Sequence, residues 1–242
     1  MQKKCIIIPA FNEAENIGAV IAGIRKNSDA DLIVIDDGST DSTVLKSRHD
    51  GVIVISHPFN MGYGVALQTG YKYAVRHGYD YLVQMDGDGQ HNPHFLPELV
   101  KPIETQECDV VIGSRYMRQG DYKAGFLKSS GVKFFRFLIW LINRQRITDP
   151  TSGFQCLNKK VFTFYTADSF PCDYPDTNII IVLHRMGFRV KEIPVSMVQN
   201  PSGRRMHQGI FTILYYLFKM ILSIFIVLIR EKSYYSVKEI DQ

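Results

Sequence analysis

Short apolar runs alternating with amphipathic stretches constrain the fold of this chain more than any other feature. The runs are nearly continuous and rich in Ile and Val, which is the pattern of strands buried on both faces of a parallel sheet. Five of them are found in the first half, at residues 4–8, 31–36, 51–56, 80–86 and 109–113. Helical spacing lies between them, at Ile17, Val20, Ile21 and Ile24, and over about 63–77 and 94–104. The first half is therefore predicted to be a βαβ series.

The second half of the chain is less regular. Residues 131–142 predict a basic, aromatic, amphipathic helix, and both packing on the core and contact with a membrane are open for it. A helix over about 174–186 and a strand over about 188–195 are expected to follow.

The stretch over residues 210–229 is almost wholly apolar, with Lys219 near its middle. About 20 apolar residues suffice to span a bilayer, and a Lys in mid-span costs about 2.5–3.5 kcal/mol on insertion scales. A spanning helix and a helix lying in the membrane interface with Lys219 directed to water both fit this pattern. A buried helix of a soluble protein is the third alternative.

The net charge of +4 is divided unevenly along the chain. Residues 1–120 carry 11 Lys and Arg against 15 Asp and Glu, whereas residues 121–242 carry 17 against 9. The basic half also holds the most apolar stretch, which favours an anionic membrane surface or a phosphate-bearing substrate as partner. Nucleic acid is disfavoured because no compact basic stripe with interleaved aromatic residues is present. The four cysteines are widely spaced, which argues against a zinc site or a disulfide framework.

The run Asp86-Gly87-Asp88-Gly89-Gln90-His91 directly follows the expected strand over residues 80–86. Carboxylates at the carboxyl end of such a strand face the crevice where open α/β sheets bind ligands. A hard divalent cation is often held by one or two carboxylates together with substrate phosphates. The run therefore indicates a site for a metal ion and a diphosphate, although an ordinary turn would have the same composition.

Polar motifs follow four of the expected strands, over residues 9–13, 36–41, 57–64 and 86–91. Because the carboxyl ends of parallel strands meet at one edge of a sheet, we expect the four motifs to converge. A P-loop is excluded because no Gly-Lys-Ser/Thr follows the glycines. An EF-hand is excluded because His91 and Pro97 stand where that loop needs Gly and Glu.

These motifs, together with Gly-Ser-Arg-Tyr at 113–116 and Asp-Pro-Thr-Ser-Gly-Phe at 149–154, resemble those of the family 2 inverting glycosyltransferases. The resemblance covers residues 4 to about 208, and within the family it is greatest to the polyprenyl- and dolichyl-phosphate hexosyltransferases. It implies an α/β fold of the GT-A nucleotide-diphospho-sugar transferase type, with a mostly parallel central sheet flanked by helices. Residues 1–208 would form the catalytic domain, and residues 209–242 an apolar membrane-associated helix and a polar tail.

The resemblance also implies roles on the donor side. Asp88 and Gln90, with Asp86, would hold Mg²⁺ or Mn²⁺ bridging the diphosphate, and Asp86 could instead contact the ribose. For Glu13 and Asp37, a role as helix-end carboxylates remains open. The residues expected to bind the nucleotide sugar are Pro9, Phe11, Glu13, Asp37, Asn60, Gly62, Asp86, Gly87, Arg204 and Arg205.

Arg204 and Arg205 stand where the polyprenyl-phosphate enzymes usually show Arg-x-x-Gly-x-Ser-Lys. Here Asn200 replaces the first Arg, and Arg205 replaces Ser. Arg204, Arg205 and His207 would clamp the diphosphate, or the segment would be a basic stretch that meets lipid headgroups.

On the acceptor side, Arg115 is expected to grip an acceptor phosphate, for which a guanidinium fork is suited. A surface ion pair is the alternative for this residue. Asp149 and Ser152 would shape the acceptor loop or act as caps. Asp176 falls where many family members have the general base, which an alcohol acceptor needs and an ionised lipid phosphate does not. Asp88, Asp176 and Arg115 are thus the expected catalytic residues.

The function expected from the resemblance is metal-dependent, inverting transfer of a sugar from a nucleoside-diphosphate sugar to a lipid acceptor, with polyprenyl phosphate favoured. The start of the chain shows no signal-peptide pattern. We therefore expect a location at the cytoplasmic face of the cell membrane, anchored by residues 210–229, and a homo-oligomer is open. One alternative is the extension of a lipid-linked saccharide in surface polysaccharide synthesis. Others are a non-catalytic nucleotide-sugar-binding subunit and, less favoured because no Gly-rich loop lies near the first strand, a nucleotidyltransferase.

Overall fold

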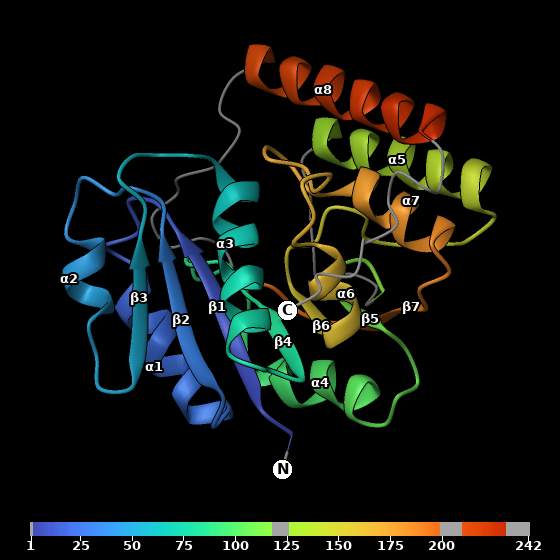
Figure 1. Cartoon of the computed structure of the whole chain (residues 1–242). Coiled ribbons are helices and arrows are strands. Elements are labelled where there is room, and N and C mark those ends of the chain that lie inside the picture. The colour runs from blue at the N-terminus through green and yellow to red at the C-terminus, as the bar shows by residue number, and fades with distance from the viewer. Residues whose placement is uncertain (1, 118–125, 199–209, 231–242) are drawn as a thin grey trace.

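The computed structural model describes residues 2–117, 126–198 and 210–230, with the backbone alone at 126–129 and 210–214. Its centre is a seven-stranded sheet in the order β3-β2-β1-β4-β6-β5-β7 (Figure 1). The strands are β1 (Lys4–Ala10), β2 (Asp31–Asp36), β3 (Val52–Ser56), β4 (Tyr81–Gln84), β5 (Val110–Ser114), β6 (Gln155–Asn158) and β7 (Val190–Pro194). Every pairing is parallel except the two that β6 makes with β4 and β5, so the predicted α/β class with a mostly parallel sheet is confirmed.

Helices cover both faces of the sheet (Figure 1). They are α1 (Ile17–Asn27), α2 (Thr43–Ser47), α3 (Tyr63–Arg76), α4 (Leu96–Glu104), α5 (Phe126–Asn143), α6 (Lys159–Phe164), α7 (Thr177–Arg185) and α8 (Ile210–Ile229), with a 3₁₀ turn η1 (Pro93–Phe95). Because side chains alternate along a strand, Ile7 of β1 packs in one apolar cluster with α3, α5, α6, α7 and α8. Its neighbours Ile6 and Ile8 pack in a second cluster with α1 and α4.

The predicted strands and helices of the first half are confirmed within a few residues, with one informative difference at β4. The expected strand over 80–86 ends at Gln84. Met85 still donates to the Ile7 carbonyl, but the Asp86 amide turns away from the sheet and donates to the His91 ring. Asp86 therefore lies in a loop. The short elements α2, β6 and α6 were not predicted, because four to six residues are too few to show a hydrophobic period.

Helix α8 has the predicted bounds, 210–229, and lies beside α5 and α7 at the top of Figure 1. Met220, Ile224 and Val227 follow one another at helical spacing and are buried against the protein. Among the described residues, no helix combines the length and the apolar character needed to cross a membrane. Association of α8 with a membrane therefore stays a prediction.

Candidate active site at the carboxyl edge of the sheet

The four polar motifs that follow β1, β2, β3 and β4 meet at one edge of the sheet, as predicted. Backbone hydrogen bonds join them in sequence across the edge. The Asp37 amide donates to Ala10 (2.8 Å), the His57 amide to Asp36 (2.8 Å) and the Gly87 amide to Pro9 (3.3 Å). Pro9 thus contributes a carbonyl rather than a side chain to the floor of this edge.

The loops after β1 and β2 are tied together by Asn12. Its amide donates to Ser39 Oγ at 2.9 Å, and its side-chain oxygen accepts from the Thr40 amide at 2.9 Å. Next to it, the Glu13 carboxylate accepts from Asn16 at 2.7 Å. Phe11 is 43% exposed, so its ring is open to a ligand from solvent. Phe11 and Glu13 therefore lie beside the motif of β2, as a nucleotide site formed by both loops requires.

Asp37 is buried, and the protein itself engages both of its oxygens. Oδ1 accepts from His57 Nδ1 at 2.7 Å and from the Met61 amide at 2.9 Å, and Oδ2 accepts from the Gly62 amide at 2.9 Å. The carboxylate therefore holds the loop that precedes α3. A direct contact of Asp37 with the nucleotide stays a prediction. His57, which the sequence analysis did not single out, is its ring partner and also lies 2.9 Å from Thr69 Oγ1.

Gly62, just before α3, and Gly64, within α3, are constrained to glycine in different ways. Gly62 has φ +101°, a conformation that side-chain-bearing residues rarely adopt. At Gly64 an added Cβ would lie 2.3 Å from the Pro171 carbonyl oxygen and 2.5 Å from that of Cys172. In the structure, the group that approaches Gly64 is the protein's own backbone at 171–172.

Asp86 is fixed by two neighbours. Tyr63 Oη donates to its Oδ1 at 2.8 Å, and its own amide donates to Nδ1 of the buried His91 at 3.0 Å. Since Nδ1 accepts, the neutral ring carries its proton on Nε2, which lies 3.5 Å from Asp86 Oδ2. Burial lowers the pKa of His91 to about 4, so the ring is neutral near pH 7. Burial also raises the pKa of the Asp86 carboxyl.

Asp88 and Gln90 form the other half of the run. The Gln90 amide donates to Asp88 Oδ1 at 2.9 Å, and its side-chain nitrogen contacts Oδ2. Burial, and then the charge of Asp86, raise the pKa of the Asp88 carboxyl. A divalent cation would offset the repulsion between the two carboxylates.

Carboxylate and amide oxygens are the donors that Mg²⁺ and Mn²⁺ prefer, so Asp86, Asp88 and Gln90 fit such an ion. No cluster of three or more His, Cys, Asp or Glu suited to a metal is found in the described part of the chain. Mg²⁺ is often held by one or two carboxylates together with substrate phosphates and water, and such groups would complete the coordination here.

Behind the carboxylates lies a buried polar network that starts from β4. Gln84 donates to Tyr63 Oη at 3.1 Å and accepts from Tyr71 Oη at 2.6 Å. Gly153 packs directly against Tyr63 and Asp86, because an added Cβ there would lie 2.9 Å from Tyr63 Oη and 3.0 Å from Asp86 Oδ2. The loop before β6 thus abuts the carboxylate predicted to serve the donor.

That loop is held by a buried ion pair. Arg115 Nε and Nη2 donate to the two oxygens of Asp149 at 2.6 and 2.7 Å, and Nη2 also reaches Thr151 Oγ1 at 2.9 Å. Ser152 Oγ donates to the Gly113 carbonyl at 2.6 Å. The fork expected to grip an acceptor phosphate is therefore engaged by Asp149, and a contact of Arg115 with the acceptor stays a prediction.

Asp176 immediately precedes α7 and receives a hydrogen bond from α8. Tyr216 Oη donates to Asp176 Oδ2 at 2.9 Å. Burial raises the pKa of Asp176 to about 6, against the lowering effects of the Tyr216 hydrogen bond and the Arg115 charge. The charges of Asp86 and Asp149 also raise it, so Asp176 belongs to the same electrostatic neighbourhood. Tyr216 was not predicted, because nothing in the apolar stretch 210–229 marks one tyrosine as a site residue.

Other predicted residues are less informative. Asn60 is exposed, and Gly87 is buried against the Pro9 carbonyl. Arg204, Arg205 and His207 lie outside the residues that the structure describes.

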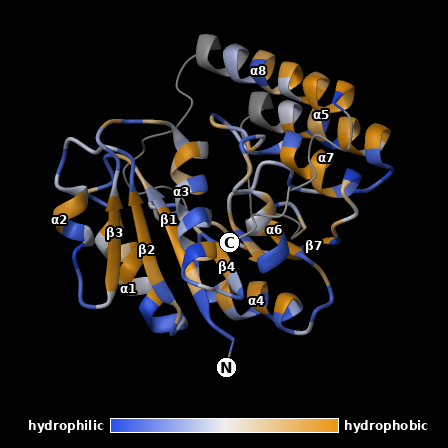
Figure 2. Cartoon of the chain, viewed as in Figure 1, coloured by the Kyte–Doolittle hydropathy of each residue, from blue (hydrophilic) through white to orange (hydrophobic). Residues whose placement is uncertain are grey.

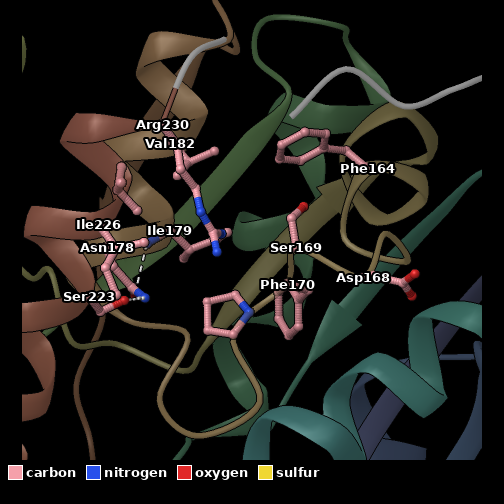
Figure 3. Close-up of a pocket in the computed structure, with 12 residues that line it drawn as sticks. Phe164, Asp168, Ser169, Phe170, Asn178, Ile179, Val182, Ser223, Ile226 and Arg230 are labelled. Atoms are coloured by element: carbon pink, nitrogen blue, oxygen red, sulfur yellow. Dashed lines mark hydrogen bonds between the residues drawn. The ribbon is translucent and has the colours of Figure 1, made fainter. Parts of the chain in front are cut away.

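A separate cavity of about 230 Å³ lies between α7, α8 and the loop after α6 (Figure 3). Phe170, Ile179 and Ile226 are among its lining residues. Asn178 also lines it, donating to Ser223 Oγ at 2.7 Å and accepting from the Asp176 amide at 3.1 Å. Through Asn178 the cavity adjoins the backbone of Asp176. In the described part of the chain, no predicted site residue lines it.

Comparison with known proteins identifies the family of this chain. Residues 5–165 match the family model described as Glycosyl transferase family 2. The chain is 27% identical over 212 residues to the UDP-N-acetylglucosamine–dolichyl-phosphate N-acetylglucosaminyltransferase of Methanococcus voltae, covering 80% of this chain and 84% of that protein. It is also 27% identical over 216 residues to the undecaprenyl-phosphate mannosyltransferase of Micrococcus luteus, covering 84% and 86%.

A similar solved structure is glucosyl-3-phosphoglycerate synthase from Mycobacterium tuberculosis in complex with Mn²⁺, UDP and glucosyl-3-phosphoglycerate. The TM-score is 0.71 at 22% identity, covering 93% of this chain and 80% of that one. At this identity the likeness concerns the fold, and it confirms the GT-A fold expected from the sequence.

Proposed function

We propose that this chain, which belongs to glycosyl transferase family 2, moves one sugar from a nucleoside-diphosphate sugar to a lipid acceptor, with polyprenyl phosphate favoured. The observation that carries the proposal is the position of Asp86 and Asp88 after β4, the middle strand of the sheet. On one side lie the loops of β1, β2 and β3, and on the other the loop held by Arg115 and Asp149. Relatives named for dolichyl-phosphate and undecaprenyl-phosphate acceptors support the choice of acceptor.

On the donor side, Asp88 and Gln90 would hold the metal ion, with Asp86 kept in position by Tyr63 and His91. When bound, Mg²⁺ or Mn²⁺ neutralises negative charge that develops on the departing nucleoside diphosphate. Phe11 is available to pack on the base. Tyr63 orients Asp86 through a bond of 2.8 Å, which keeps one carboxylate oxygen from rotating away.

On the acceptor side, we propose an inverting displacement. The bond from the anomeric carbon to the diphosphate oxygen breaks while a bond to an acceptor oxygen forms on the opposite face. A phosphate acceptor brings an oxygen that is already ionised, so no base is needed. Arg115 keeps the loop at 149–153 against Asp86 and would thereby shape the space for the acceptor.

The proposed membrane location rests on α5 and α8, which are largely hydrophobic in their described residues (Figure 2). Lys219 pairs with Asp173, and the other face of α8 packs on the protein. Both features support a helix lying in a membrane interface. The cytoplasmic face is part of the proposal. The exposed large hydrophobic residues in the described parts of the two helices are Phe134, Phe137, Trp140 and Leu141 of α5 with Tyr215, Phe218, Ile221, Leu222, Phe225, Ile226, Leu228 and Ile229 of α8.

The test is a transfer assay with the membrane-bound protein, Mg²⁺ or Mn²⁺, labelled UDP-, GDP- and dTDP-sugars, and undecaprenyl phosphate. We expect label to enter the organic phase with wild type and not with Asp88→Ala. The matched control is Asp29→Ala, since Asp29 is 80% exposed and pairs only with Lys4 among the described residues. Equal transfer by wild type and Asp88→Ala would refute the metal assignment.

A second candidate, extension of a lipid-linked saccharide, is favoured by Asp176. A carboxylate with a pKa of about 6 beside the site is suited to accept a proton from a sugar hydroxyl. In that case Asp176→Asn would lose transfer while still binding nucleotide. Metal-dependent hydrolysis of the donor without labelled lipid phosphate would point to this candidate.

A further inference from the structure

A guanidinium next to the acceptor side has donors that the protein leaves unused. Arg136 lies on α5, and its Nε and Nη2 are buried without a hydrogen-bond partner among the described residues. A buried charged donor that lacks a partner costs free energy, so its presence calls for an explanation.

The two unused atoms form one edge of the guanidinium. Arg115 uses the same pair, Nε and Nη2, to grip the two oxygens of Asp149. Two parallel N–H groups match two oxygens of a carboxylate or a phosphate. Arg136 therefore has the same pair of donors that Arg115 uses to bind Asp149, and in Arg136 this fork of two donors is available for an anion.

The surroundings of Arg136 place it on the acceptor side. Its guanidinium carbon lies 4.5 Å from the centre of the Tyr116 ring, and Tyr116 directly follows Arg115. The preceding residue, Phe135, packs edge-on against Tyr216 with ring centres 6.2 Å apart, and Tyr216 holds Asp176. The fork thus lies against the residue that follows Arg115, on a helix that also packs against Tyr216 of α8.

The charged residues of the helix that carries the fork are all positive. Between Asp121 and Asp149 the sequence has no acidic residue, whereas it has Lys or Arg at 123, 128, 133, 136, 144 and 146. No carboxylate on α5 can therefore serve as partner. One residue further along, Phe137 is 55% exposed on the face proposed to meet lipid.

We propose that the Nε–Nη2 edge of Arg136 binds the phosphate monoester of the acceptor lipid. The inference rests on the proposed function, since it names the group that recognises that acceptor. An anion reaches this edge only when the side chains that now cover it shift. Once bound, it is shielded from water, where charge-assisted hydrogen bonds are strong.

The first experiment measures steady-state transfer by Arg136→Met, Arg136→Lys and the control Lys133→Met. Lys133 lies one turn earlier on the same helix and is exposed. Loss of two charge-assisted bonds should raise the KM for undecaprenyl phosphate by about tenfold or more in Arg136→Met. Arg136→Lys should recover only part of the affinity for undecaprenyl phosphate, because an ammonium group lacks the two parallel N–H donors of a guanidinium. Lys133→Met should stay within about twofold, as surface substitutions do.

Thermal unfolding separates binding from a structural role. Replacing an unpaired buried charge by an apolar side chain of similar length is often neutral or stabilising. The Tm of Arg136→Met should therefore equal or exceed that of wild type. A lower Tm together with an unchanged acceptor KM would mean that Arg136 serves only to pack on Tyr116, and the inference would fail.

A binding measurement does not depend on turnover. Trp140 is the only tryptophan and lies one turn after Arg136, so its fluorescence reports a lipid bound there. In detergent, wild type should show a saturable change with undecaprenyl phosphate and a weaker one with undecaprenol, which lacks the phosphate. Arg136→Met should respond equally to both lipids. An equal response of wild type to both would overturn the inference.

Vesicles distinguish the acceptor from an ordinary headgroup. Sedimentation with phosphatidylglycerol vesicles lacking polyprenyl phosphate should be the same for wild type and Arg136→Met. A loss of binding in the variant would assign the fork to a phospholipid headgroup and overturn the inference. Transfer by wild type together with an unchanged acceptor KM in Arg136→Met would refute the role of Arg136 but would leave the proposed function unaffected. Absence of transfer by wild type to any lipid phosphate would instead refute that function.

Discussion

Arg115 and Asp149 face each other side-on, with two parallel hydrogen bonds of 2.6 and 2.7 Å and almost no exposure to solvent. The Arg115 amide adds a third bond to the same carboxylate, at 3.0 Å. The pair joins the end of β5 to the loop before β6. Because Gly153 of that loop abuts Asp86, the ion pair helps to set the distance between the two sides of the site.

Asp149→Asn should destabilise the protein strongly. The substitution leaves the buried Arg115 charge uncompensated, which typically costs about 3–5 kcal/mol. The free energy of unfolding in urea measures the loss. Glu107→Gln is the matched control, since Glu107 pairs with Lys191 where both are about half exposed, and such pairs contribute about 0–1 kcal/mol. Equal costs for the two substitutions would contradict a structural role for the buried pair.

Asp88→Asn should lower kcat by about 100-fold or more, because a metal site that loses a carboxylate no longer offsets several kcal/mol of developing charge. Binding of Mn²⁺ in the presence of the nucleoside diphosphate, followed by calorimetry, should fall in parallel. Wild type should also bind Mn²⁺ less well as the pH falls, since the raised pKa of Asp88 lets protons compete with the metal. Asp29→Asn should match wild type in each measurement.

Tyr216→Phe should move the pH profile of transfer to a hydroxyl acceptor. Such an acceptor needs the ionised form of Asp176, so the rate should fall as the pH drops through the pKa of about 6. The Tyr216 hydrogen bond lowers the pKa of Asp176, so its loss should raise that pKa and shift the acid limb to higher pH. Tyr215→Phe, on the exposed neighbour, should leave the limb in place. An unmoved limb in Tyr216→Phe would mean that Asp176 is not the titrating base.

Gly64→Ala should destabilise the protein by about 1–3 kcal/mol, the usual cost of forcing extra atoms into a packed region. The new Cβ would meet backbone atoms of Pro171 and Cys172, which cannot rotate away. Gly18→Ala is the matched helical control. Nothing lies within 4 Å of a Cβ there, so it should stabilise the protein by about 0.5–1 kcal/mol. Unfolding midpoints that move in the same direction for both would refute the packing argument.

The strands of the first half could be predicted because each is a continuous apolar run with a polar motif at its end. The meeting of these motifs then follows from parallel pairing alone. Strand β6 could not be predicted in this way, because Gln155 and Asn158 interrupt its apolar character and its direction is set by pairing with β4 and β5.

Within the site, the sequence marks residues whose motif is local, such as Asp86 and Asp88. It does not mark partners that tertiary packing brings in. Tyr216 reaches Asp176 from 40 residues away, in a stretch whose composition indicates only an apolar helix. Gly64 is a glycine for a reason that becomes visible only when the backbone at 171–172 is placed beside it.

The hydrogen bond from Tyr216 to Asp176 can form only late in synthesis of the chain, because Tyr216 follows every other residue of the candidate site in the described part of the chain. All seven strands precede α8 in the sequence, so they emerge from the ribosome before the phenol that completes the surroundings of Asp176. A nascent chain halted before residue 216 can contain Asp86, Asp88 and Arg115 and yet have an Asp176 without its Tyr216 donor. The surroundings of Asp176, on the proposed acceptor side, are therefore completed after the segments that carry Asp86, Asp88 and Arg115.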